Sequence, residues 1–533
     1  MSANSHELPM RRTAAGEQIE TRPLHVEEWL DSLPYVDFRK TSRLLFEATQ
    51  ATNAQTLKAT DRIELVQLYH RPYQYYVESQ IRTGAQHTLQ SIETMQEQVE
   101  VLKRIGVNLA LACKLAAEET LKQRTLWGQT KPPLPALLSA LNYLSHALIF
   151  NFLEYAPTPK SIWRELHFVH EFAESLNRQN DTVLPIGGAP DKDATTIAAA
   201  YRRIAMASLT DPHHLPFGAI WEIYEQLGQW SKHVVIGKFE PGSSPGGHFV
   251  IDLAGDSRPA PLSGFVPGAG RDRLRLVDAS AIGGLIEEQL ERLNAGQRLT
   301  EGMRLSPFFA KSVLGHLLRA WGLPPKRNLP REARQGTLRL ACGVNGVFYF
   351  LNGAKEFVPP ADGDAAEAEA EAAGNAASAA PAVDNWELVD QGPSGFAVMK
   401  AERPRYYVRV GELVAISESP DAEGGGKWSL GIVRWMMVRQ GKGYRIGVQT
   451  ITRAAAAAAI RAVTGSGQDC RFRRALVFPD AGDGNRTCVI TDRGLFLGGR
   501  GLELSRDGRA SRVSCGTLVE GAIGFDCFTL VES

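Results

Sequence analysis

Cationic side chains with a spacing suited to anions stand shortly after the middle of the chain. Lys326 and Arg327 are followed four positions on by Arg331, with Pro330 between them. An arginine guanidinium presents a planar fork of donors that matches phosphate oxygens, and the same fork can bond O6 and N7 of guanine. We therefore predict an arm over residues 326–331 that can close over a ligand with phosphate and guanine groups.

A short acidic, glycine-containing segment could form the opposite wall of such a site. It reads Asp390-Gln-Gly392-Pro-Ser-Gly395. An aspartate at a strand edge can accept hydrogen bonds from N1–H and N2–H of guanine. The two glycines would let the backbone approach a ligand closely and adopt a positive φ. Each segment alone is a common pattern, a basic linker or a turn, so the prediction depends on their lying together.

Short β runs must position these residues, and such runs begin after Gly322. Several of them alternate apolar and polar residues between Gly or Pro, as the strands of a small antiparallel barrel do. The runs cover residues 337–341, 347–351, 396–399, 413–417, 430–434 and 444–450. We predict an antiparallel β-barrel over residues 322–452.

A low-complexity segment, 359–384, interrupts this barrel. It is rich in alanine and acidic residues and lacks large apolar side chains, so it cannot bury enough surface to fold. We predict a disordered insertion there. Without its 26 residues, the separation of Arg331 and Asp390 falls from 59 to 33 positions, which suits two strands and a turn.

The part before the barrel has apolar residues at helical spacing and predicts a helical domain over 24–321, behind a disordered leader, 1–23. Two similar tryptophan-containing segments, 162–167 and 219–224, suggest stacked helical hairpins, as in superhelical proteins. One isolated strand is expected at 246–253. We predict that this half binds a partner protein in a concave groove.

The part after the barrel, 453–533, is predicted to be a short helix followed by a second small β module. The alanine-rich run 453–463 favours the helix, and β runs follow over 470–533. The fold class is thus multidomain α + β, with an all-α N-terminal half, an antiparallel β-barrel and a second β module.

Three segments of the barrel resemble the PilZ family, which binds cyclic di-GMP. They are the RxxxR motif Arg327–Arg331, the segment 390–395, which is similar to [D/N]xSxxG, and Trp428-Ser-Leu-Gly-Ile-Val-Arg-Trp with the later Ile-Gly-Val of 446–448. The resemblance implies that Arg327 and Arg331 clamp phosphate and guanine and that Asp390 reads a guanine edge. The serine of the motif is Gly392 here, and some PilZ-like domains bind no nucleotide.

The wider chain is similar to bacterial proteins that join a long helical region to an atypical PilZ barrel and a further β segment. The resemblance implies a cytoplasmic cyclic di-GMP effector that acts in a process such as surface attachment or type IV pilus function. The chain would have no other cofactor and no metal.

Composition argues against several other classes. The 59 basic and 59 acidic residues cancel, whereas a protein that binds long DNA or RNA is usually basic. The sequence has no apolar run as long as a transmembrane helix requires, so we predict no insertion in a membrane. The six scattered cysteines suit reduced thiols in the cytosol.

Catalytic and metal motifs are weak. The run from His167 to Glu171 reads HxxHE, which is not the zincin motif, and His213-His214 has no ligand cluster nearby in the sequence. Gly424-Gly-Gly-Lys427 is followed by Trp428, where a P-loop needs Ser or Thr. We therefore predict that the chain is not an enzyme.

Two functions of different kinds remain open at this point. In the first, the chain is a non-catalytic cyclic di-GMP receptor that passes ligand binding on to a protein partner. In the second, it is a nucleotide-independent scaffold whose helical domain binds a partner. An unrecognised enzyme or chaperone-like factor is a third possibility.

Overall fold

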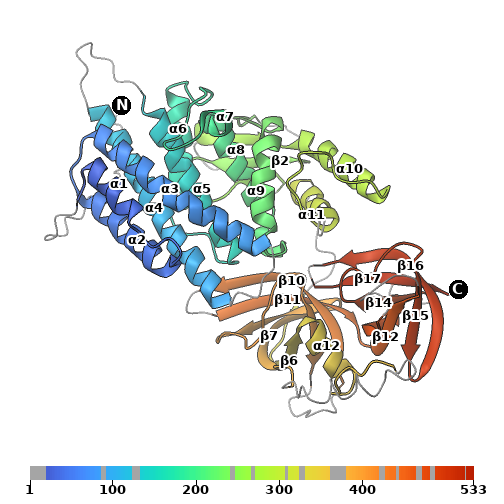
Figure 1. Cartoon of the computed structure of the whole chain (residues 1–533). Helices are drawn as coiled ribbons and strands as arrows, with labels where there is room; N and C mark the ends of the chain where they lie inside the picture. The colour runs from blue at the N-terminus through green and yellow to red at the C-terminus, as the bar shows by residue number, and fades with distance from the viewer. Residues whose placement is uncertain are drawn as a thin grey trace.

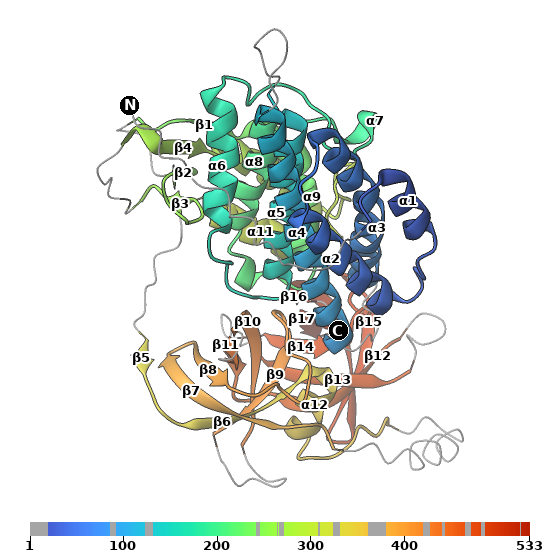
Figure 2. The same ribbon diagram turned by 90° about the vertical axis from the view of Figure 1, so that its left-hand side faces the viewer.

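The computed structural model shows a helical part that lies above two β-barrels, and the barrels stand side by side (Figures 1 and 2). The residues that the structure describes are 20–85, 92–122, 132–240, 246–263, 265, 271–306, 310–322, 331–360, 380–418, 427–439, 443–463, 471–480, 486–522 and 524–532. The fold class predicted from the sequence is confirmed.

Long helices build the first half. In chain order they are α1 (Pro23–Asp31), α2 (Phe38–Ala54), α3 (Ala59–Ala85), α4 (Ile92–Lys122), α5 (Leu134–Leu153), α6 (Ile162–Ser175), α7 (Pro190–Asp193), α8 (Ile197–Ser208), α9 (Ala219–Trp230), α10 (Ser280–Asn294) and α11 (Ala310–Trp321). Helix α5 is apolar all round and is packed among α4, α6, α8 and α9. By length and composition it could cross a membrane, but 83% of its apolar window is buried inside the protein, as in a central core helix.

A four-stranded antiparallel sheet stands where one isolated strand was predicted. Its order is β1 (Val235–Lys238), β4 (Leu274–Asp278), β2 (His248–Asp252) and β3 (Ala260–Pro261). The short run 274–278 was missed because its apolar residues alternate over only five positions, too few to separate from a loop.

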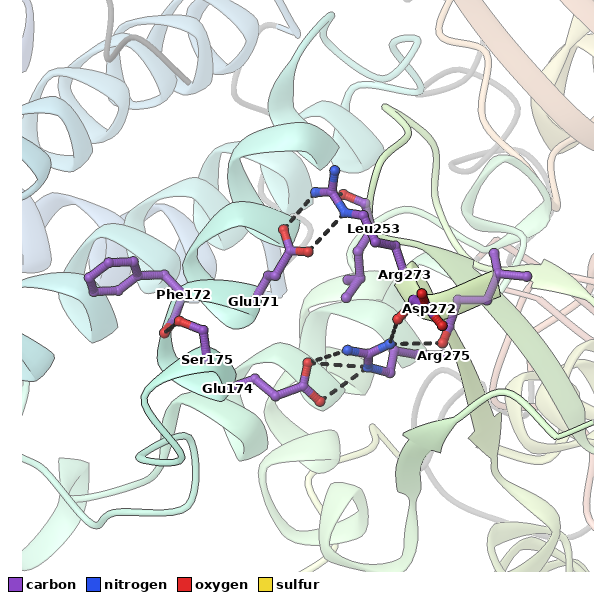
Figure 3. Close-up of polar contacts among 9 residues, drawn as sticks. Glu171, Phe172, Glu174, Ser175, Leu253, Asp272, Arg273 and Arg275 are labelled. Atoms are coloured by element: carbon purple, nitrogen blue, oxygen red, sulfur yellow. Dashed lines mark hydrogen bonds and ion pairs between the residues drawn. The ribbon is translucent and has the colours of Figure 1, made fainter. Parts of the chain in front are cut away.

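Two arginines fasten this sheet to α6, Arg275 of β4 and Arg273, which directly precedes β4 (Figure 3). Arg275 binds Glu174 with Nη2–Oε2 at 2.5 Å, and Arg273 binds Glu171 with Nη2–Oε2 at 2.6 Å. Both carboxylates lie on α6 one turn apart, so the helix and the strand meet along one edge.

The first barrel consists of β6 (Thr337–Cys342), β7 (Asp384–Gly392), β8 (Gly395–Lys400), β9 (Leu413–Ser417), β10 (Ser429–Arg439) and β11 (Gly443–Thr452). The strands close in the order β7-β6-β9-β10-β11-β8, and β7 pairs again with β8. Its interior holds Leu340, Trp386, Val398 and Ile446, each fully buried. The barrel predicted from the sequence is therefore present.

The run 347–351, predicted to be a strand, is instead part of helix α12 (Gly343–Leu351). Gly343 has φ of +85°, which turns the chain out of β6. Val344, Val347, Phe348 and Leu351 then recur with a spacing of three to four and pack against the outside of the barrel. A five-residue apolar run fits the period of a helix and that of a strand, and here packing against the barrel favours the helix.

The second barrel consists of β12 (Ala456–Ala462), β13 (Arg473–Pro479), β14 (Thr487–Thr491), β15 (Gly501–Arg506), β16 (Arg509–Gly521) and β17 (Asp526–Glu532). These strands close in the order β12-β13-β14-β17-β16-β15. The alanine-rich run predicted to be a helix is thus the strand β12. Its backbone pairs with β13 and β15, and these two ladders outweigh the helical preference of alanine.

The insertion predicted at 359–384 ends earlier than expected. Asp384 is the first residue of β7, its side chain is 3% exposed, and its Oδ1 lies 2.8 Å from Nε of Arg405. The central part of the insertion, 361–379, and the start of the leader, 1–19, lie outside the described residues.

The helical part is joined to the first barrel through Tyr155, just beyond α5. Its carbonyl accepts a hydrogen bond from the Val438 N–H of β10 at 2.9 Å. Its hydroxyl donates to the carbonyl of Leu215 at 3.0 Å, and its ring belongs to the apolar core of the barrel.

Candidate functional site

The structure brings Arg331 and Asp390 together at the edge of the first barrel. A short strand, β5 (Glu332–Ala333), pairs with β7 so that Ala333 stands opposite Asp390. Arg331 directly precedes β5, and its Nη1 lies 2.8 Å from Oδ1 of Asp390. Lys326 and Arg327, the other two predicted cationic residues, lie outside the described residues.

Gly392 and Gly395 close the hairpin between β7 and β8, where they face each other. The expectation of positive φ was wrong, because neither glycine adopts it. Gly395 is needed for close approach instead: a Cβ there would lie 2.1 Å from the carbonyl oxygen of Val448 on β11. The hairpin is therefore held tightly against the neighbouring strand.

Asp390 accepts from a second arginine, which sequence reasoning missed. Nη2 of Arg445 on β11 lies 3.4 Å from Oδ2 of Asp390, so both carboxylate oxygens are engaged. Arg445 also lies above the ring of Trp435, with 5.7 Å between the guanidinium carbon and the ring centroid. Strand register, which no local pattern shows, puts these residues side by side.

Small residues form the floor between Asp390 and Trp435. Asp390 pairs with Ala397, Ala397 with Gly447, and Gly447 with Trp435, so the four lie in one row across β7, β8, β11 and β10. A Cβ on Gly447 would collide with the indole, at 1.8 Å from its Nε1. We call the surface of Asp390, Ala397, Arg445, Gly447 and Trp435 the Asp390 face.

The Asp390 face and its rim have a surplus of hydrogen-bond donors. Arg331 and Arg445 both donate to Asp390, and Arg334, just after β5, donates from Nη1 to Oε1 of the next residue, Gln391, at 2.6 Å. Nε of Arg445 is buried and has no hydrogen-bond partner in the described part of the chain. Each guanidinium has five N–H donors, so a single carboxylate leaves most of them available to an anion.

The HxxHE cluster noted in the sequence has a structural role. His167 hydrogen-bonds Tyr201 through Nδ1 at 2.6 Å and the carbonyl of Ser257 through Nε2 at 3.0 Å. Burial lowers the pKa of His167 to about 4, so its ring is neutral. Glu171, from the same motif, binds Arg273. No group of three His, Cys, Asp or Glu side chains within the described ranges is placed to hold a metal ion.

Comparisons with known proteins agree with this architecture. A family model described as the N-terminal domain of the cyclic-di-GMP receptor FimW matches residues 24–241. A second, described as the middle PilZ domain of the same receptor, matches residues 248–386 and 360–457. The chain is also 22% identical to the cyclic-di-GMP receptor FimW of Pseudomonas aeruginosa, over 92% of this chain and 88% of that protein. The chain therefore belongs to the FimW family and carries that family's PilZ domain.

Proposed function

We propose that this chain is a cyclic di-GMP receptor that binds its ligand at the Asp390 face of the first barrel. The observation that carries the proposal is the meeting of Arg331, Asp390 and Arg445 around a floor of small residues. The similarity to a protein named as a cyclic-di-GMP receptor supports the same ligand. No step of catalysis is needed for this role.

The ligand-binding step follows from the chemistry of these groups. The phosphates bind the guanidinium of Arg331, and Arg327 of the same motif would join it. A guanine edge donates N1–H and N2–H to the carboxylate of Asp390, in place of one of its arginines. The base lies against Trp435 and the guanidinium of Arg445, which offer flat surfaces for stacking.

Binding must break the pair between Arg331 and Asp390, and the cost of this is small. The two side chains are 39% and 20% exposed, and ion pairs at such surfaces contribute about 0–1 kcal/mol. A ligand with two phosphates replaces this contact with several charge-assisted hydrogen bonds, each worth about 1.5–3 kcal/mol. The ion pair thus keeps the arginine in place without blocking the site.

Calorimetric titration with cyclic di-GMP tests the proposal, with GMP and GTP as controls for ligand specificity. We expect saturable binding that weakens about 10- to 100-fold in Arg331→Ala and Asp390→Ala, the loss of one or two charge-assisted bonds. The matched control is Arg506→Ala, an arginine of β15 on the second barrel that is 51% exposed. If the intact chain binds no cyclic di-GMP at high micromolar ligand, the proposal fails and a nucleotide-independent scaffold takes its place.

The wider role is a proposal of the same kind. We infer a cytoplasmic receptor whose helical part contacts a protein partner, in a process such as surface attachment or type IV pilus function. The backbone hydrogen bond between Val438 and Tyr155 supports this, because it connects β10 of the ligand-binding barrel directly to the helical part. Capture of a partner by the intact chain, with and without cyclic di-GMP, distinguishes a receptor from a scaffold.

A further inference from the structure

The second barrel connects its strands in the same order as the first. When the strands of each barrel are numbered 1 to 6 along the chain, both barrels have the order 1-2-3-6-5-4. In both, strand 4 pairs with strand 1 and closes the barrel. All twelve pairings are antiparallel. Six strands can close a barrel in many other orders, so the shared order marks the two barrels as copies of one fold.

On the surface equivalent to the Asp390 face, the rows that cross β13, β14 and β17 contain only uncharged side chains. In the first barrel this surface lies on the second, third, sixth and fifth strands, which correspond to β13, β14, β17 and β16. Two outward rows cross those strands. They consist of Phe478, Cys488 and Thr529 in one row and Leu476, Ile490 and Cys527 in the other. We call these two rows the Cys488 face. Neither row contains a charged side chain on β13, β14 or β17, and on β16 the residue opposite Cys527 is Glu520, an anion that would repel phosphate.

The first barrel covers the Cys488 face. Cys488 and Cys527 are only 2% and 6% exposed, although both point away from the interior of their own barrel. They belong to the same apolar cluster as Ala415 of β9, Leu430 of β10 and Phe348 of α12. The contact is therefore unsymmetrical: the second barrel uses its equivalent of the ligand face, and the first barrel uses the opposite side.

Arg434 links this contact to the Asp390 face. Its guanidinium binds both carboxylate oxygens of Glu520 on β16, with distances of 2.6 and 3.0 Å. Its Nε also donates to Oε1 of Gln449 at 2.7 Å, and Gln449 pairs with Gly395 of the hairpin beside Asp390. A β-bulge between Val433 and Trp435 lets Arg434 and Trp435 both point outward although they are consecutive.

We propose that the C-terminal barrel is a second PilZ-type barrel that no longer binds nucleotide. The face that would bind ligand in a PilZ barrel instead holds this barrel against the first one. Through Arg434, ligand binding at the Asp390 face would change this contact between the barrels. This response of the contact rests on the proposed cyclic di-GMP binding, whereas the docking of the two barrels does not.

Thiol labelling of the intact chain, followed by peptide mass spectrometry, tests the docking. Cys488 and Cys527 report on the contact, while Cys515 inside the second barrel and Cys113 in the helical core report on folding. We expect all four to be protected in the wild type. Rapid labelling of Cys488 and Cys527 in wild-type protein with Cys515 still protected would overturn the docked arrangement.

A variant of the first barrel sharpens this test. Ala415 is fully buried in the contact but lies outside the interior of its barrel, so Ala415→Arg should separate the barrels without unfolding either. We expect labelling of Cys488 and Cys527 to rise roughly tenfold or more, because local opening controls the reactivity of buried groups. Ala401→Arg, at an exposed position of the same barrel, is the matched control and should change nothing. If Ala415→Arg exposes Cys515 as well, that variant has unfolded and the wild-type result decides.

Cyclic di-GMP tests the two remaining parts of the proposal. The double variant Arg331→Ala/Asp390→Ala should bind no ligand. Saturable binding by this variant that slows hydrogen exchange in β13 and β14 would show that the second barrel still binds nucleotide.

Ligand should change the labelling rate of Cys488 in the wild type, and Glu520→Gln should remove this change while ligand affinity stays within about twofold. A chain that binds ligand with no change at Cys488 contradicts the proposed response of the contact. If the wild type binds no cyclic di-GMP, the proposed function fails, and the labelling without ligand still decides the docking.

Discussion

Arg434 and Glu520 face each other across the two barrels, and two hydrogen bonds of 2.6 and 3.0 Å join the guanidinium to both carboxylate oxygens. Removing either partner should loosen the contact only modestly, because the side chains are 40% and 27% exposed. We expect Arg434→Ala and Glu520→Ala each to raise the labelling rate of Cys488 by roughly two- to fivefold. The double variant should label no faster than the faster single one, since the two residues share one interaction. Additive effects would show that they act separately.

Restoring the serine of the PilZ motif should tighten ligand binding. Gly392 has no positive φ, so its backbone accepts a side chain without strain. A hydroxyl there adds one hydrogen bond, and we expect Gly392→Ser to bind cyclic di-GMP up to about tenfold more tightly by calorimetry. Gly392→Ala serves as the control without a hydroxyl. Equal affinities for both variants would mean that the serine has no direct part in recognition.

Gly395 should be the least replaceable residue of the hairpin. A Cβ there would meet a backbone carbonyl at 2.1 Å, and neither strand can move away without breaking the ladder. We expect Gly395→Ala to destabilise the first barrel by about 1–3 kcal/mol in thermal unfolding, as overpacking does. Gly501→Ala, on β15 where nothing lies within 4 Å of the added Cβ, should leave the unfolding temperature within about a degree. Equal effects of the two substitutions would contradict this account.

Glu222 on α9 should make the helical part less stable as pH rises. Burial raises the pKa of Glu222 to about 7, above its ordinary value of 4.5. Between these two values the folded chain keeps a proton that the unfolded chain has lost, so stability falls as pH increases through this window. Glu222→Gln keeps the acceptor for the Ser306 N–H and removes the titration.

Scanning calorimetry at pH 5 and pH 8 measures this effect. We expect the Glu222→Gln variant to be similar to wild type at pH 5 and more stable at pH 8, by about 1–2 kcal/mol after allowance for partial exposure. Glu288→Gln, at an exposed position of α10, is the control and should show no such difference. A variant that gains stability equally at both pH values would rule out the titration of Glu222 as the cause.

The two arginines that fasten β4 to α6 should differ in importance. Arg275 has 8% of its side chain exposed and Arg273 has 38%, although both bind a glutamate of α6 (Figure 3). We expect Arg275→Ala to destabilise the helical part by about 1.5–3 kcal/mol, because it removes a buried guanidinium that bonds Glu174 and two backbone carbonyls. Arg273→Ala should cost about 1 kcal/mol. Comparable losses in chemical denaturation would show that burial does not set the energy here.

The sequence was sufficient for the parts of the proposed site that stand in recognisable motifs. Motif spacing placed Arg331 near Asp390, and alternation predicted the barrel that carries both. Arg445 and Trp435 could not be predicted, because they reach the same face through the pairing of β11 with β10 and β8. Register of this kind depends on the whole sheet and leaves no local pattern.

The misassigned segments have the same origin. The run 347–351 is short enough to fit a helix or a strand, and the alanines of β12 have a helical preference that the fold overrides. Packing against the outside of one barrel made the first a helix, and two neighbouring strands made the second a strand. The shared strand order of the two barrels was also invisible, because their outward faces have opposite chemistry.

The bulge in β10 places the proposed ligand site and the contact between the barrels on adjacent residues. Trp435 forms a wall of the proposed ligand site, and Arg434 holds the second barrel, yet a single peptide bond separates them. Because the two residues share one peptide unit, a displacement of the backbone at Trp435 also displaces the backbone at Arg434. Communication between the barrels then requires no chain of intermediates, and substitutions in the barrel interiors should leave it intact as long as the barrels fold.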